Sequence, residues 1–171
     1  SVGLLQRQQI YRLLEETLGQ NNIQQVLELN CGTGEDAVWL AERGLNVHAT
    51  DIAPKMVERA RQKGKSLLKD KENSGRISYQ TLDCNQLSAL DNANKYDLIF
   101  SNFGGLNCLN AEELKRFSAE SAKRLTPDGI LVAVVMSSFC WWESLYFLLK
   151  RNWKQAWRRR SKDPIAAPLN E

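Results

Sequence analysis

Histidine and paired cysteines are scarce in this chain of 171 residues. There is one histidine, His48, and the four cysteines contain no Cys-x-x-Cys pair. This pattern lacks the usual zinc motifs, so we expect no metal site. A disulfide framework is not expected in a domain of this size, and we interpret the cysteines as reduced thiols of a cytoplasmic protein.

We also expect no signal peptide and no uninterrupted membrane span in this sequence. Residues 1–20 are polar and periodic, without the apolar stretch of a signal peptide. Residues 130–149 are mostly apolar, but polar side chains interrupt them and the turn residues Pro127-Asp128-Gly129 precede them. We predict a buried strand followed by an amphipathic segment.

An excess of one charge is likewise missing, since the formal net charge is only +3. No nucleic-acid recognition module is visible, so a nucleic-acid partner is disfavoured. Basic residues nevertheless gather in 150–162, where they lie opposite tryptophans at helical spacing. We predict one domain over 1–136, with 137–171 as its lid or amphipathic basic extension. The alternative for 141–162 is a helix that contacts an anionic membrane or a lipid.

Strand-like and helix-like segments alternate along the first 136 residues. Pro54 and the capping box of Asn110 and Glu113 mark two helix starts. The alternation predicts an α/β fold, a doubly wound and mostly parallel Rossmann-like sheet with helices on both faces. The last strand is apolar throughout, so we expect it to be covered on both faces. The expected strands are 26–31, 46–51, 77–83, 96–103 and 130–136, and the expected helices are 4–18, 35–43, a helix from Pro54, and 111 to about 125.

The most informative motif is the strand that begins at Val26 and runs into Gly32-Thr33-Gly34, answered by Asp51 at the end of the next strand. A glycine turn before a helix exposes backbone N–H groups to a ligand carboxylate or phosphate. An acid at the end of the second strand can accept hydrogen bonds from two ribose hydroxyls. Together they predict a nucleoside-containing cofactor across the strand ends.

With these residues assembled, the chain resembles the class I S-adenosylmethionine-dependent methyltransferases, in particular the small-molecule branch with a Glu-Leu-x-Cys-Gly-Thr-Gly motif. The resemblance covers residues 4–136. It implies S-adenosylmethionine as cofactor and a small organic molecule as methyl acceptor. The tryptophan-rich segment after residue 139 favours an acceptor that is hydrophobic or lipid-like. The family's sheet ends with a sixth strand and an antiparallel seventh, which we do not find after Met136. We therefore expect the final strands to be missing and residues to be absent at both ends.

Carried over residue by residue, the resemblance also implies roles at the strand ends. Glu28 and Asn30 lie near the methionine end of the cofactor, Asp51 binds the ribose, and Asp83 accepts from the adenine amino group. The implied cofactor-binding set is Glu28, Asn30, Gly32, Thr33, Gly34, Asp51, Ile52, Asp83, Cys84, Ser101 and Asn102. The residues implied to border the acceptor pocket are Phe103, Gly104, Gly105, Leu106 and Asn107, with Trp142 as a further candidate.

The sequence marks no catalytic residue. A sulfonium donor leaves as a neutral thioether, so methyl transfer needs no acid for the leaving group, and alignment can supply about 7–11 kcal/mol. A general base is needed only where the acceptor must first lose a proton. We interpret His48 and Asp97 as structural and Cys31 as a packing residue.

Two other functions stay open. Gly32-x-Gly34-x-x-Ala37 also fits a dinucleotide fingerprint, so an NAD(P)-binding oxidoreductase is one alternative. A non-catalytic cofactor-binding or membrane-surface module is the other. The residues after the fourth strand are Asn102-Phe103-Gly104-Gly105 instead of the Pro-Pro-aromatic motif of enzymes that methylate base amines or glutamine, which disfavours those acceptors. The oligomeric state is left open.

Overall fold

The computed structural model describes residues 2–69, 74–91, 93–136, 147, 149 and 150. The chain divides into two compact units, Ser1–Val135 and Met136–Glu171. Trp142 and nearly all of the predicted extension lie outside the described residues, so the lid or membrane role of 137–171 stays a prediction. Among the described residues, no helix combines the length and apolar character that crossing a membrane requires.

Five parallel strands form a single sheet in the order β3-β2-β1-β4-β5, which confirms the predicted doubly wound fold. The chain builds outward from β1 in one direction, through β2 and β3, and then returns to the other side of β1 with β4 and β5. The strand order therefore reverses between β1 and β4, where ligands bind in open α/β sheets. The strands are β1 (Gln25–Leu29), β2 (Asn46–Asp51), β3 (Ile77–Thr81), β4 (Tyr96–Ser101) and β5 (Leu125–Ala133).

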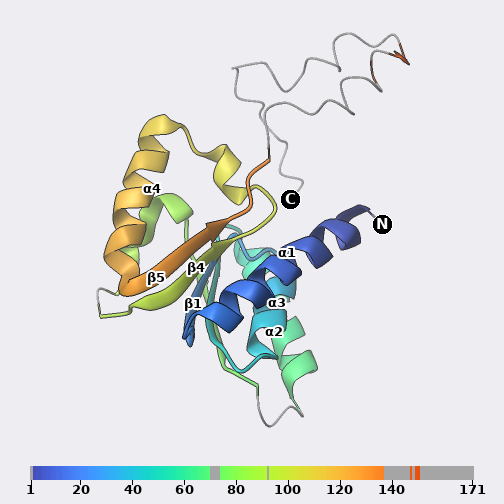
Figure 1. Cartoon of the computed structure of the whole chain (residues 1–171), viewed down its shortest axis with the longest axis vertical. Coiled ribbons are helices and arrows are strands. Elements are labelled where there is room, and N and C mark those ends of the chain that lie inside the picture. Colours follow the sequence, from blue (N-terminus) through green and yellow to red (C-terminus); the bar gives the residue numbers. More distant parts are fainter. Residues whose placement is uncertain (1, 70–73, 92, 137–146, 148, 151–171) are drawn as a thin grey trace. The chain divides into compact units, whose positions relative to one another are not determined.

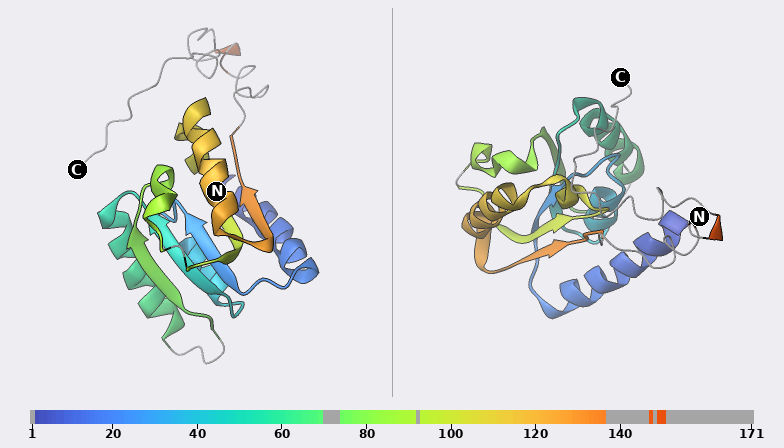
Figure 2. Two further views of the ribbon diagram at one scale, coloured as in Figure 1. Left: turned by 90° about the vertical axis from the view of Figure 1, so that its left-hand side faces the viewer. Right: turned by 90° about the horizontal axis from the view of Figure 1, so that it is seen from above.

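Helices cover both faces of the sheet, as expected (Figure 1). The helices α1 (Val2–Gln20), α2 (Glu35–Ala41) and α3 (Pro54–Leu68) lie on one side, whereas α4 (Ala111–Arg124) lies on the other. Two short 3₁₀ helices follow β3 and β4, namely η1 (Cys84–Ala89) and η2 (Gly105–Cys108). The views of Figure 2 separate α4 from α1 and α3 in the same way.

Alternation along β1 divides its side chains between two cores. Val26 packs with Leu14 and Leu40 of the helices on one face, whereas Leu27 packs with Leu87 and Phe117 on the other. All of these side chains are buried. Successive residues of a strand point to opposite faces, so Glu28 shares the face of Val26, toward α1 and α2.

The predicted start of α4 is confirmed in atomic detail. The Asn110 side chain accepts from the Glu113 backbone N–H at 3.0 Å, and the Glu113 carboxylate accepts from the Asn110 N–H at 2.8 Å. This reciprocal capping box satisfies two donors that a helix start otherwise leaves unpaired.

Two expectations about the last strand are wrong. First, β5 begins at Leu125, directly after α4, and it includes the Pro127-Asp128-Gly129 segment that we predicted as a turn. The pairing of β4 with β5 shifts register here, because Tyr96 pairs with Leu125 but Leu98 pairs with Ile130. The residues between Leu125 and Ile130 form an irregularity in β5.

Second, the strand is not covered on both faces. Leu131 is 40% exposed, and Val135, just after the strand, is 63% exposed. Among the described residues, β5 pairs only with β4, so its apolar side chains are less covered than those of a central strand.

Candidate functional site

The predicted site residues meet at one edge of the sheet. The Gly32–Gly34 loop follows β1, Asp51 ends β2, Asp83 follows β3, and Ser101 ends β4. Because all five strands are parallel, these positions share the carboxyl edge. The loops after β1 and β4 are neighbours at the reversal point, since these two strands pair directly. The parallel topology therefore brings residues from four parts of the sequence to one place.

The loop after β1 is a tight turn with three residues in the left-handed region. Asn30, Gly32 and Gly34 have positive φ values of 57°, 54° and 76°. A Cβ on Gly34 would lie 2.8 Å from the Ala60 Cβ, so this glycine lets the loop lie against α3. A Cβ on Gly32 would meet no atom within 4 Å. Gly32 thus lies at an open surface, where the backbone is accessible to a ligand.

Asp51 holds this loop in place. One carboxylate oxygen accepts from the Gly32 N–H at 2.8 Å, and the other accepts from the Ala53 N–H at 2.9 Å. Each carboxylate oxygen can accept more than one hydrogen bond, so both keep capacity for further donors. The half-buried Asp51 can therefore fix the turn and also accept from a diol at the end of β2.

Glu28 is a buried acid without a full set of partners. It is 2% exposed, and its Oε2 has no hydrogen-bond partner in the described part of the chain. Burial raises the pKa of Glu28 well above its usual value, and the nearby Asp36 raises it further, while Arg7 opposes the shift. A buried carboxylate normally has a partner, so this position suits a cationic or hydrogen-bond-donating ligand.

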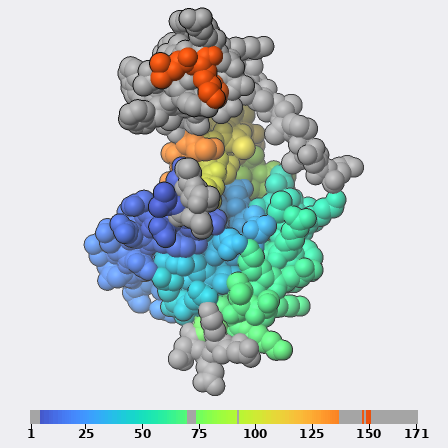
Figure 3. Space-filling view, turned by 90° about the vertical axis from the view of Figure 1, so that its right-hand side faces the viewer, coloured from blue at the N-terminus to red at the C-terminus, as the bar shows by residue number. Residues whose placement is uncertain are grey.

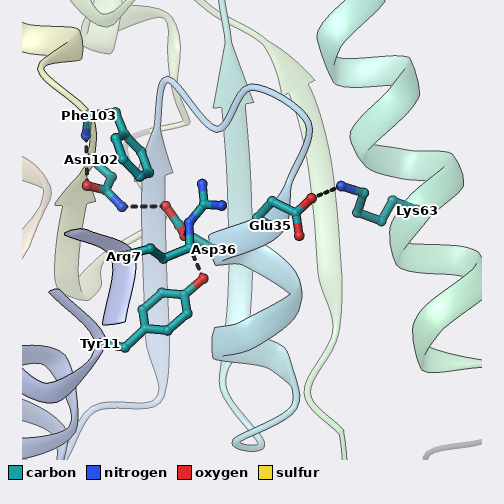
Figure 4. A network of polar contacts seen from close by, with 7 residues as sticks. All are labelled: Arg7, Tyr11, Glu35, Asp36, Lys63, Asn102 and Phe103. Atoms are coloured by element: carbon teal, nitrogen blue, oxygen red, sulfur yellow. Dashed lines mark hydrogen bonds and ion pairs between the residues drawn. The ribbon is translucent and has the colours of Figure 1, made fainter. Parts of the chain in front are cut away.

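Next to Glu28 lies a polar network centred on Asp36, which sequence reasoning missed (Figure 4). Asp36 accepts from the Tyr11 hydroxyl and from the Asn102 amide, both at 2.7 Å, and its Oδ1 lies 3.1 Å from the Arg7 Nε. The network joins α1, α2 and the end of β4. Only the place of Asp36 in the first turn after the glycine loop could have marked it, because its partners are distant in the sequence.

The loop after β4 is shaped by the same network. Asn102 accepts from the Phe103 N–H at 2.7 Å, and Phe103 has a positive φ of 50°. The Arg7 guanidinium carbon lies 4.7 Å from the centre of the Phe103 ring. A Cβ on Gly105 would overlap the Asn30 amide at 2.2 Å, so this glycine lets the two loops approach each other.

The remaining predicted residues lie at the same edge with simpler roles. Asp83 accepts from the Asn85 N–H at 2.8 Å and begins η1. Ile52 is 62% exposed, an apolar side chain open to a ligand beside Asp51. Burial raises the pKa of both Cys31 and Cys84, so neither is a reactive thiolate.

His48 and Asp97 lie away from this site, as we expected. The His48 Nδ1 lies 2.7 Å from the Tyr96 hydroxyl, and burial lowers the His48 pKa. Asp97 accepts from the backbone N–H groups of Gln24 and Gln25, both at 2.9 Å, before β1 begins its buried run. Both residues belong to the amino half of their strands and make structural contacts there.

Comparison with known proteins agrees with this geometry. A family model described as "Methyltransferase domain" matches residues 26–129. The non-reducing polyketide synthase prhL of Penicillium brasilianum is 31% identical over 136 residues, which are 75% of this chain and 5% of the synthase. YqeM of Bacillus subtilis (strain 168), designated a methyltransferase by its name, is 32% identical over 115 residues, or 67% of this chain and 43% of YqeM.

A solved structure shares the fold. It is an S-adenosylmethionine-dependent methyltransferase from Clostridium acetobutylicum ATCC 824, with a TM-score of 0.60 and 23% identity over 73% of this chain and 48% of that one. The chain spans less than half of the length of each of these relatives. It belongs to the methyltransferase domain family, and the predicted class, the S-adenosylmethionine-dependent methyltransferases, is confirmed.

Proposed function

We propose that this domain binds S-adenosylmethionine at the carboxyl edge of its sheet and transfers the methyl group to a small organic molecule. The observation that carries the proposal is the unpartnered Oε2 of buried Glu28, beside a glycine turn that Asp51 holds in place. S-adenosylmethionine has an ammonium group that can donate to Glu28 and a ribose diol that can donate to Asp51. The adenine would then lie against Ile52, near Asp83 and Cys84.

The residues of the site bind and orient, and none of them is assigned to acid–base chemistry. When bound, the cofactor supplies a methyl group on a sulfonium whose loss leaves a neutral thioether. The hydrogen bond between Asn102 and the Phe103 N–H holds the turn after β4, which would border the methyl acceptor. Catalysis by alignment alone is consistent with such a site.

For the acceptor, we infer a small and partly apolar molecule. Phe103 is 42% exposed, which places an apolar side chain at the border of the site. The name of one relative, a non-reducing polyketide synthase, supports an organic small molecule. Trp142 and the contact of 141–162 with a lipid or membrane are inferred from the sequence alone.

A titration with three ligands tests the cofactor. S-adenosylmethionine and S-adenosylhomocysteine should raise the melting temperature and bind in calorimetry, whereas NAD(P) should do neither. Stabilisation by NAD(P) alone would instead support the oxidoreductase alternative, because the pyrophosphate of NAD(P) also suits a glycine turn.

Asp51→Ala should weaken S-adenosylhomocysteine binding by about 1–3 kcal/mol, because charge-assisted hydrogen bonds to the ribose are lost. Asp91→Ala is a matched control, since Asp91 also accepts from the backbone N–H two residues ahead, that of Ala93, at 3.0 Å. The control should bind as the wild type does. Equal affinity of the Asp51 variant and the wild type would contradict the assignment.

A further inference from the structure

The strand β3 lies at one edge of the sheet, beside α3 (Figure 2). Among the described residues it pairs only with β2. The Arg76 carbonyl accepts from the Val47 N–H at 2.7 Å, and the Leu82 N–H donates to the Asp51 carbonyl at 2.9 Å. Backbone groups alternate in direction along a strand, so the even-numbered residues of β3 turn theirs toward β2.

The odd-numbered residues of β3 turn their backbone groups outward. These residues are Ile77, Tyr79 and Thr81. The Arg61 Nη2 reaches the Tyr79 carbonyl from this outer side, at 3.4 Å, which is long for an N–H···O hydrogen bond. Arg61 also forms an ion pair with Glu58 at 2.9 Å. Outward backbone groups of this kind can pair with a further strand.

The surface is hollowed on both faces of β3. The α3-side hollow, of about 650 Å³, is lined by Leu68 and Tyr79 among others. The amino-end hollow, of about 720 Å³, is lined by His48 and Ser78, whose side chains belong to the opposite face of the sheet. Side chains of an added strand would alternate between the two faces, so each hollow can take every second one.

Both hollows are basic. Lys65 lines the α3-side hollow, Lys95 lines the amino-end hollow, and Arg76 lines both, whereas no described Asp or Glu lines either. Lys95 donates to the Lys123 carbonyl, but Lys65 and Arg76 are exposed and have no acidic partner among the described residues. A second copy of the chain at this edge would bring like charges together. An acidic strand would instead be complementary to them.

We propose that the outer edge of β3 binds an extended acidic peptide segment as a further strand. Its main chain pairs with the outward backbone groups of β3, and its carboxylates contact Lys65 and Arg76. Arg61 leaves the Tyr79 carbonyl when the peptide binds. Neither hollow contains a residue of the proposed cofactor site, so this inference does not depend on the proposed function.

The probe is a short end-blocked peptide of alternating glutamate and threonine, added to the whole chain. Hydrogen exchange followed by NMR reads the amides of β3 one by one. The peptide should slow exchange at Ile77, Tyr79 and Thr81, whose N–H groups gain a partner. Exchange at Ser78 and Gln80 should change less, because these amides already face β2.

Two control peptides separate strand pairing from attraction between charges. One has lysine in place of glutamate, and it should leave the exchange of β3 unchanged. The other keeps the glutamates but is methylated on its backbone nitrogens, so it cannot donate to β3. It should also lose the protection of the outward amides.

Variants test the charged contacts. Lys65→Gln and Arg76→Gln should each weaken binding of the glutamate peptide by about twofold to fivefold, the effect of one exposed ion pair. Arg59→Gln is the matched control, because Arg59 is an exposed residue of α3 that lines neither hollow. It should bind the peptide as the wild type does. Fluorescence anisotropy of the labelled peptide measures these affinities.

Several results would overturn the proposal. They are no protection of the outward amides by the glutamate peptide, equal protection by the lysine peptide, and undiminished binding of the methylated peptide. Sedimentation that shows a dimer, with the outward amides protected before any peptide is added, would assign this edge to a second copy instead. None of these readouts uses S-adenosylmethionine, so failure here is distinct from failure of the proposed function.

Discussion

At the scale of single residues, Glu28 is where stability and ligand binding conflict. A buried carboxylate without a partner for one oxygen destabilises the folded chain. Burial raises its pKa, so the folded protein holds a proton that the unfolded chain releases at a lower pH. The position is explained if a cationic group completes it, and S-adenosylmethionine has one at the required end.

Replacement of Glu28 by glutamine should therefore stabilise the folded protein and lower its affinity for the cofactor. Above the usual glutamate pKa of about 4.3, the folded form of the wild type binds more protons than the unfolded form, so its stability falls as pH rises through that window. Glu28→Gln should lack this decline and gain on the order of 1 kcal/mol near neutral pH.

Urea unfolding of both proteins from about pH 4, near the ordinary glutamate pKa, to about pH 8 measures the effect. Glu16→Gln, at an exposed position of α1, should leave the pH profile unchanged. Parallel profiles for the wild type and Glu28→Gln would show that the Glu28 pKa is not raised.

At the scale of elements, α1 is fastened to α2 by a stack of side chains. The rings of Tyr11 and Trp39 are stacked with centres 4.1 Å apart, and the Arg43 guanidinium carbon lies 3.6 Å from the centre of the Trp39 ring. Arg43 also forms an ion pair with Glu15 at 2.6 Å. Figure 3 shows the dark blue surface of α1 bordering the lighter blue surface of the segment that includes α2. These contacts join the middle of α1 to α2 and to the residues that follow it.

The glycine loop depends on two glycines for different reasons, and alanine variants should separate them. Both residues have positive φ, so each variant should cost about 1–2 kcal/mol of backbone strain. Gly34→Ala should cost about 1–3 kcal/mol more, because its Cβ would also press on Ala60 of α3. Chemical denaturation measures the difference, with Gly32→Ala as the matched reference. Equal losses in the two variants would mean that the loop can move away from α3 without cost.

At the scale of the whole molecule, the parallel sheet separates the edge of the proposed site from an edge with structural contacts. The loops after β1, β2 and β4 converge at the carboxyl edge, whereas Asp97 and its backbone contacts lie at the amino end. A ligand at the carboxyl edge should therefore stabilise the fold by mass action, by about 2.7 kcal/mol at a concentration 100 times its Kd.

Hydrogen exchange with and without S-adenosylhomocysteine should locate this stabilisation. Protection of amides in the loops at 30–36, 51–54 and 101–107 should rise more than protection of the turns before β1 and β4, because the proposed ligand site lies at the carboxyl edge. Uniform protection over the first unit would show only global stabilisation. Protection confined to the amino edge would contradict the site.

Patterns that are local in the sequence were enough for most of the fold. The bounds of β2 and the capping box of α4 follow from strand patterning and cap chemistry, which act between residues a few positions apart. The site edge followed from parallel topology, since residues after parallel strands must gather at one end. The bounds of the other strands were less accurate, because a strand ends where its pairing ends, and pairing is not local.

By itself, therefore, the sequence determined the order of elements, the doubly wound sheet and the glycine–acid signature of the methyltransferase class. Only the tertiary structure decided that Arg7, Tyr11 and Asn102 meet on Asp36, that Gly34 makes room for α3, and that β5 keeps an exposed face. The physical reason is the range of the interactions. Backbone propensities and caps act over one or two turns of chain, whereas the partners of Asp36 come together only when separate helices and strands pack.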